Sequence, residues 1–146
     1  MNSATRTEKI LIPVDGSDNA LRAVDYAAKM AIESNSLKFE LLHVLEPMPL
    51  RAHAALAQNE INLVYADEAK RILLPAQRIL DLAGLSHCAH YRVGHPANEI
   101  SAQVTDKNCD AVIMGTRGLG FLGRAATGSV ASQVVHLVNV PVTLVK

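Results

Sequence analysis

The sequence predicts an α/β fold: a doubly wound, five-stranded parallel sheet with helices on both faces, of the Rossmann-like kind. Strand-like and helix-like patterns alternate along the chain, five of the first and four of the second. Residues 9–14 and 110–114 are apolar at nearly every position, as in strands that are buried on both faces. The expected strand order is 3-2-1-4-5, and the 146 residues fit one domain, 1–146.

Two strands and two helices are expected in the first half. The strand 9–14 is followed by Ser17, a favourable N-cap residue, and by a helix with one apolar face. That face contains Ala20, Leu21, Val24, Ala27, Ala28, Ala31 and Ile32. Residues 37–44 form the second strand, and Pro47 and Pro49 predict a loop that extends to about Ala54.

A long helix then precedes Gly84, which is a typical residue just beyond a helix C-terminus. Its expected inner face contains Ile61, Val64, Tyr65, Ile72, Ala76, Ile79, Leu80 and Ala83. Pro75 lies inside this pattern. Because proline removes a helical hydrogen bond and clashes with the preceding turn, we expect a kink or a break near Leu74.

The second half continues the alternation. Residues 87–93 are the third and weakest strand, and Pro96 opens a helix whose buried side contains Ala97, Ile100 and Val104. The fourth strand, 110–114, is followed by a glycine-rich stretch and by a helix at 130–138. A short fifth strand, 142–145, completes the sheet.

The glycine-rich stretch, 115–129, holds five of the eight glycines. Glycine lets the backbone approach a ligand closely, and the N-terminus of the next helix favours phosphate. With the strand order 3-2-1-4-5, the loops after strands 1 and 4 diverge at one crevice, where such sheets bind ligands. Asp15 follows strand 1, so this carboxylate and the glycine-rich backbone are expected to meet there.

Three nucleotide motifs can be compared with this stretch. No lysine stands in it, which excludes a P-loop. Gly118, Gly120 and Gly123 match G-x-G-x-x-G, but they follow strand 4 and lack the acidic residue of a dinucleotide fingerprint. The third pattern is Gly115-x-x-Gly118, nine further residues, and Gly128-Ser129.

With this spacing the chain resembles the ATP-binding universal stress protein family, whose pattern is G-x-x-G-x9-G-[ST]. The resemblance extends over nearly the whole chain. It includes KILIPVDGS at the start, LLHV in strand 2, GHPANEI, DAVIMGTRG and the closing VPVTLVK.

The resemblance implies a role for each matching position. The backbone of Val44 would contact adenine, and Pro13, Val14, Met114 and Gly115 would line the region of the base and ribose. Donors to the phosphates would come from Gly118, Gly128, Ser129 and Val130. Arg117 would add positive charge, and Asp15 would steer a Mg²⁺ ion carried by ATP, since magnesium needs few protein oxygens beside phosphate.

Composition excludes other classes. The 14 basic and 14 acidic residues balance and only 3% of residues are aromatic, which argues against a nucleic-acid partner. The chain has no apolar run of membrane-spanning length and a polar start, so we expect a cytoplasmic protein without a membrane partner. Cys88 and Cys109 are expected to be reduced. The six histidines form no metal-binding motif, and His87 and His90 fall on opposite faces of a strand, so no metal ligands are expected.

The function that follows is ATP binding as a regulatory ligand in a stress response. No nucleophile–base pair emerges, so no catalytic residues are assigned and at most slow ATP hydrolysis is expected. Two alternatives stay open: a weak ATPase or another nucleotide-using enzyme, and a nucleotide-free dimeric interaction module. Because strand 142–145 lies at an edge of the sheet, we expect a homodimer paired through it, as the family commonly forms.

Overall fold

The computed structural model describes residues 6–116 and 129–146, and a single parallel sheet forms its centre. The five strands lie in the order β3-β2-β1-β4-β5, and every neighbouring pair is parallel. Their bounds are Glu8–Pro13 (β1), Leu37–Leu45 (β2), His87–Val93 (β3), Ala111–Gly115 (β4) and Val142–Val145 (β5). The predicted strands and their order are therefore confirmed.

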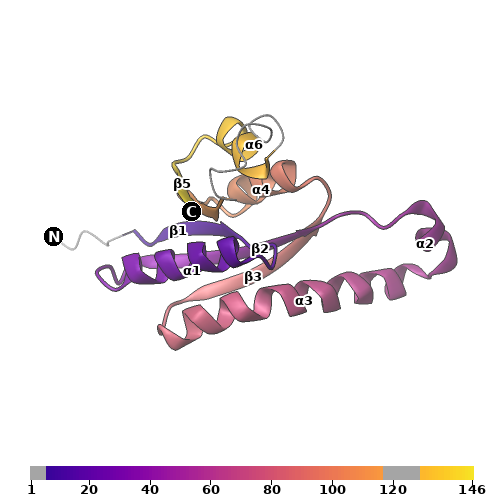
Figure 1. Cartoon of the computed structure of the whole chain (residues 1–146), viewed down its shortest axis with the longest axis horizontal. Coiled ribbons are helices and arrows are strands. Elements are labelled where there is room, and N and C mark those ends of the chain that lie inside the picture. The colour runs from indigo at the N-terminus through magenta and orange to yellow at the C-terminus, as the bar shows by residue number, and fades with distance from the viewer. Residues whose placement is uncertain (1–5, 117–128) are drawn as a thin grey trace.

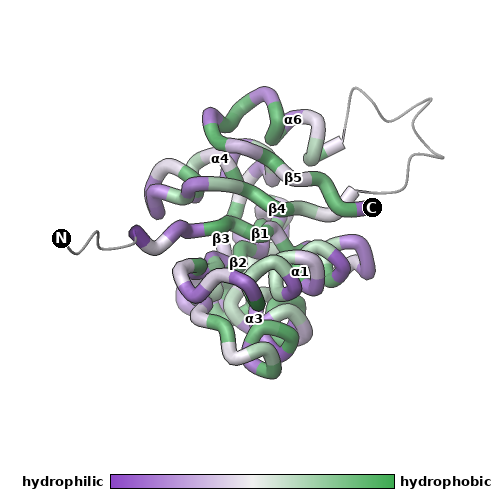
Figure 2. Tube along the Cα trace, turned by 90° about the vertical axis from the view of Figure 1, so that its left-hand side faces the viewer, coloured by the Kyte–Doolittle hydropathy of each residue, from purple (hydrophilic) through white to green (hydrophobic). Residues whose placement is uncertain are grey.

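Helices cover both faces of this sheet (Figure 2). Their bounds are Asp18–Ala31 (α1), Leu50–Ala55 (α2), Gln58–Leu82 (α3), Pro96–Asp106 (α4) and Val130–Leu137 (α6). α1 and α3 bury one face, where Phe39 and Leu41 of β2 are fully enclosed. α4 and α6 bury the other face against Leu11, Leu42 and Val112. Among the described helices, none combines the length and the apolar character that crossing a lipid bilayer requires.

Local signals set the ends of two helices as expected. The Ser17 hydroxyl oxygen accepts a hydrogen bond from the backbone N–H of Ala20 at 3.2 Å, which caps α1. Gly84 follows the C-cap of α3 with a φ of +68°, a conformation that favours glycine. His95 precedes Pro96 at the start of α4 and makes no side-chain capping bond.

Five expectations between residues 32 and 83 were wrong. The expected loop before Ala54 contains α2, and α3 continues through Pro75 without a break. Val64 is 44% exposed, Ile32 is 77% exposed and Ala83 is exposed too, so none of the three belongs to its helix's inner face. The positions that bury α3 most fully include Ala69 and Leu73, which the periodicity did not single out.

Candidate nucleotide-binding site

The ends of β1 and β4 lie side by side, because Ile10 pairs with Ala111 and Leu11 with Val112. From β1 the chain turns to α1 on one face of the sheet, and α6, which follows β4 in the chain, lies on the other face (Figure 2). This reversal is the kind of point at which α/β sheets bind ligands. Of the predicted site residues, the structure brings Pro13, Val14 and Asp15 to the same edge as Met114 and Gly115.

Asp15 lies exposed in the turn between β1 and α1. Its Oδ1 accepts a hydrogen bond from the Ser17 N–H at 2.9 Å, and Gly16 makes the turn with a φ of +85°. The carboxylate therefore stabilises the turn between β1 and α1. The side chain is exposed at this edge of the sheet.

Val14 is fixed between strands just before this turn. It is only 2% exposed, and its N–H donates to the Leu42 carbonyl at 2.8 Å. Its carbonyl oxygen lies 2.7 Å from Nδ1 of His43, which is 8% exposed. Since a carbonyl can only accept, the proton of the neutral ring belongs on Nδ1. Sequence reasoning gave His43 no role at the site, although it directly precedes Val44 near the end of β2.

Val44 lies just beyond the last residue pair of β1 and β2, which joins Pro13 to Leu42. Successive residues of a strand direct their backbone groups to opposite sides, so Val44 directs its groups to the same side as Leu42. The Leu42 carbonyl accepts from Val14 on the β1 side. The N–H and C=O of Val44 therefore face the β1 side, beyond the last pair of β1 and β2.

On the β4 side, Met114 is buried against the α4–α6 core and Gly115 meets the first turn of α1. A Cβ atom at Gly115 would lie 2.3 Å from the Asn19 carbonyl oxygen. Close packing of two backbones thus explains this glycine without a ligand. The next residue, Thr116, donates its N–H to Val145 at 2.8 Å, which holds the start of the glycine-rich stretch beside β5.

The N-terminus of α6 is the described part of the predicted phosphate site. The Ser129 hydroxyl oxygen accepts from the Ser132 N–H at 3.2 Å and so caps the helix. The hydroxyl hydrogen keeps its capacity to donate to an anion. Val130, the first helical residue, is 36% exposed. Arg117, Gly118 and Gly128 lie outside the described residues.

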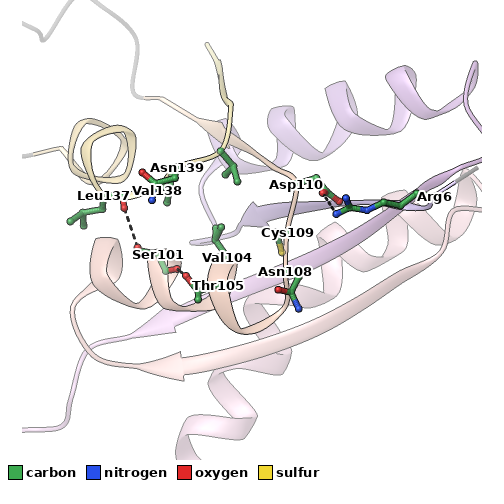
Figure 3. Close-up of a pocket in the computed structure, with 11 residues that line it drawn as sticks. Arg6, Ser101, Val104, Thr105, Asn108, Cys109, Asp110, Leu137, Val138 and Asn139 are labelled. Carbon is green, nitrogen blue, oxygen red and sulfur yellow. Dashed lines mark hydrogen bonds and ion pairs between the residues drawn. The ribbon is translucent and has the colours of Figure 1, made fainter.

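A separate pocket of about 330 Å³ opens beside the start of β4, at the opposite end of the strand (Figure 3). The C-terminal parts of α4 and α6 line it, together with the Arg6–Asp110 ion pair, whose atoms lie 2.5 Å apart. Burial, followed by the nearby charge of Glu40, raises the pKa of the Cys109 thiol to about 11. This pocket is not the crevice that the sequence predicts.

Comparisons with known proteins agree with this geometry. The model of the universal stress protein family matches residues 6–146. Universal stress protein MJ0531 of Methanocaldococcus jannaschii is 31% identical over 99% of this chain and 85% of its own length. The structure of MJ0577 superimposes with a TM-score of 0.78, at 28% identity and 97% coverage of each chain.

The universal stress protein of Archaeoglobus fulgidus, solved in complex with dAMP, has a TM-score of 0.70 and 27% identity. Its match covers 95% of this chain and 98% of its own. The resemblance inferred from the glycine spacing is therefore confirmed by both sequence and structure. The chain belongs to the universal stress protein family.

Proposed function

We propose that this protein binds ATP, with Mg²⁺ carried by the nucleotide, as a regulatory ligand in a stress response. The observation that carries the proposal is that the ends of β1 and β4 lie side by side at the point where the winding reverses. The dAMP complex of the relative from Archaeoglobus fulgidus supports an adenine nucleotide as the ligand class.

In this proposal the crevice divides into a base end and a phosphate end. The backbone of Val44 meets adenine, and Pro13, Val14, Met114 and Gly115 line the region of the base and ribose, with Val14 and Met114 buried on opposite faces of the sheet. The phosphates lie at the N-terminus of α6, where the helix dipole and the Ser129 hydroxyl favour negative charge. Gly118, Gly128 and Arg117 complete the phosphate end.

The role of Mg²⁺ follows from charge. Asp15 is an exposed carboxylate at the edge to which the phosphates come, and two negative groups repel each other. A divalent cation between them turns this repulsion into attraction, with one protein oxygen and several phosphate oxygens as ligands. Asp15→Asn should therefore weaken ATP binding in the presence of Mg²⁺ more than in EDTA.

The main test measures ATP affinity by calorimetry on Gly118→Val and Gly128→Val, with Gly123→Val as a control in the same stretch. A side chain at either of the first two positions should abolish binding while thermal unfolding stays cooperative. Gly123→Val should bind ATP as the wild type does, since Gly123 is expected to make the loop flexible and not to contact the phosphates. Unchanged affinity in the first two variants would overturn the assignment of the phosphate site.

A measurement of ATP hydrolysis distinguishes the proposed regulatory role from the two alternative functions. Tight binding without hydrolysis above a buffer blank supports a regulatory ligand, and clear hydrolysis supports an ATPase. If neither ATP, ADP nor AMP binds, the crevice belongs to a nucleotide-free interaction module. Mass spectrometry of the ligand released from the purified protein independently identifies which nucleotide, if any, is bound.

A further inference from the structure

Three side chains with metal-binding atoms converge on the α4 face of the β2–β3 pair. One atom each from Glu40, Cys88 and His90 lies within 4.8 Å of the other two. The strand register explains the convergence, because Glu40 pairs with Cys88 and Leu42 pairs with His90. Side chains two residues apart on neighbouring parallel strands leave the same face of the sheet.

The inner member of this cluster is a buried carboxylate. Glu40 is 3% exposed and lies in a strand that is otherwise mostly apolar. Burying a carboxylate is unfavourable unless a cation or hydrogen-bond donors compensate it. In the structure, Oε2 of Glu40 lies 2.8 Å from Nε2 of His90, so this ring supplies one partner.

The outer members face an access route. β3 is an edge strand of the sheet (Figure 1), and its residues are half-buried rather than enclosed. The His90 side chain is 32% exposed, and Cys88 is half-buried. An ion can therefore reach the thiol and the imidazole from solvent and contact the buried carboxylate last.

We propose that Glu40, Cys88 and His90 bind one Zn²⁺ ion, with water as the fourth ligand. Thiolate, imidazole and carboxylate are the three ligand types that zinc uses, whereas Mg²⁺ selects oxygen. Around a tetrahedral zinc the ligand atoms stand about 3.4–3.6 Å apart, as follows from the usual zinc–ligand distances. On binding, the contact between Glu40 and His90 would lengthen by about 0.6 Å, and the thiol would move inward by at most about 1.2 Å.

The charges of the three side chains also fit a Zn²⁺ ion. Zinc binding displaces the Cys88 proton to solvent, so a thiolate and a carboxylate neutralise the two positive charges of the ion. The nearest cation along β3, Arg92, is held by Glu99 at 2.6 Å and by Asp106 at 3.0 Å. Its charge is thus compensated on α4 and does not oppose the ion.

This site is independent of the nucleotide crevice. Glu40 lies in the middle of β2, in register with Leu11, whereas the crevice begins after Pro13. The test uses the full chain without nucleotide, and measures Zn²⁺ binding by competition with a chromophoric chelator. Co²⁺ serves as a spectroscopic probe, because thiolate coordination gives a charge-transfer band in the near ultraviolet.

The test variants are Cys88→Ala, His90→Gln and Glu40→Gln. The matched controls are Cys109→Ala, which removes the other thiol, and His87→Gln, which changes a histidine on the same strand. His87 bonds to Asp81 of α3 at 2.7 Å on the opposite face. Glu40→Gln keeps the shape and a hydrogen-bonding group, so it separates loss of a ligand from loss of the fold.

The wild-type chain should bind one zinc ion, show the thiolate–cobalt band and protect Cys88 from alkylation. Each test variant should lose affinity by about 100-fold or more, beyond the 10–100-fold effects of residues that only support a ligand. The two controls should bind as the wild type does. Absence of binding, or equal losses in controls and test variants, would overturn the proposal and leave Glu40 and His90 as a part-buried hydrogen-bonded pair.

Discussion

Gly115 lies where the end of β4 meets the first turn of α1. A Cβ atom there would stand 2.3 Å from the Asn19 carbonyl oxygen and 2.9 Å from the Ala20 nitrogen. Both are backbone atoms, so no side-chain rotation relieves the overlap, and α1 must move. The resemblance assigned Gly115 to a ligand, and the structure adds a packing requirement that the sequence does not reveal.

Gly115→Ala should therefore lower the free energy of unfolding by about 1–3 kcal/mol, the usual cost of forcing extra volume into a packed site. Urea denaturation measures this loss. Met114→Leu is the control at the neighbouring buried position, and a change that nearly conserves volume should cost less than about 1.5 kcal/mol. An unchanged midpoint for Gly115→Ala would contradict the close packing.

The raised pKa of Cys109 predicts that the stability of the folded chain depends on pH. Burial raises the pKa of its thiol in the folded chain to about 11, from an ordinary value of 9.0. Above pH 9 the unfolded chain loses this proton while the folded chain keeps it, so the stability due to Cys109 declines between pH 9 and 11. The stability difference between wild type and Cys109→Ala should fall across this range in urea denaturation. A constant difference would show that the thiol titrates normally.

The positions of His87 and His90 were predicted correctly, but the cluster that His90 joins was not. His87 and His90 do lie on opposite faces, as the strand period predicts: His87 meets Asp81, and His90 meets Glu40. Metal-binding motifs of closely spaced histidines do not reveal the cluster, because it joins residues 50 positions apart. The register between β2 and β3 creates it, and no local pattern encodes that register. The clearest signal in the sequence is a carboxylate inside an apolar strand.

At the scale of elements, α3 shows why the expected break at Pro75 was wrong. The helix has 25 residues, and Ala69, Leu73, Ala76 and Leu80 all bury its inner side against the sheet. Pro75 is exposed, so its ring and the missing N–H lie on the solvent side. Packing on both sides of the proline outweighs a local cost of about 3 kcal/mol.

Pro75→Ala should consequently raise the free energy of unfolding by about 2 kcal/mol. The variant restores one helical hydrogen bond, less the entropy that proline removes from the unfolded chain. Urea denaturation measures the gain, and Arg78→Ala on the same exposed side should change stability by less than about 0.5 kcal/mol. Destabilisation by Pro75→Ala would mean that the ring makes packing contacts that α3 needs.

At the scale of the whole molecule, alternation of apolar strands and amphipathic helices predicted the sheet order completely. That order also predicted that Asp15 and Gly115 share one edge, because the position of each loop follows from the order of the strands. The cap at Ser17 was predictable from the sequence as well, since a cap acts on its own helix. What could not be predicted depends on contacts distant in the chain, such as the fit of Gly115 against α1 and the bond between His43 and Val14.

The last prediction also concerns the whole molecule, namely whether two copies of the chain form a dimer. β5 is an edge strand whose outward side has no neighbour in the described sheet, and its Leu144 is 47% exposed. An unprotected edge with apolar side chains favours pairing with an identical edge, which gives a two-fold symmetric dimer. Leu144→Lys places a charge in that interface, opposite or near its own copy, so the dimer should dissociate.

Sedimentation equilibrium at micromolar concentration measures this change. The wild-type chain should sediment as a dimer, and Leu144→Lys should shift it to monomer while thermal unfolding remains cooperative. Leu82→Lys is the matched control, because Leu82 is 90% exposed at the end of α3, on the other side of the sheet from α6. A monomeric wild type would exclude pairing through β5, and equal dissociation by both variants would place the interface elsewhere.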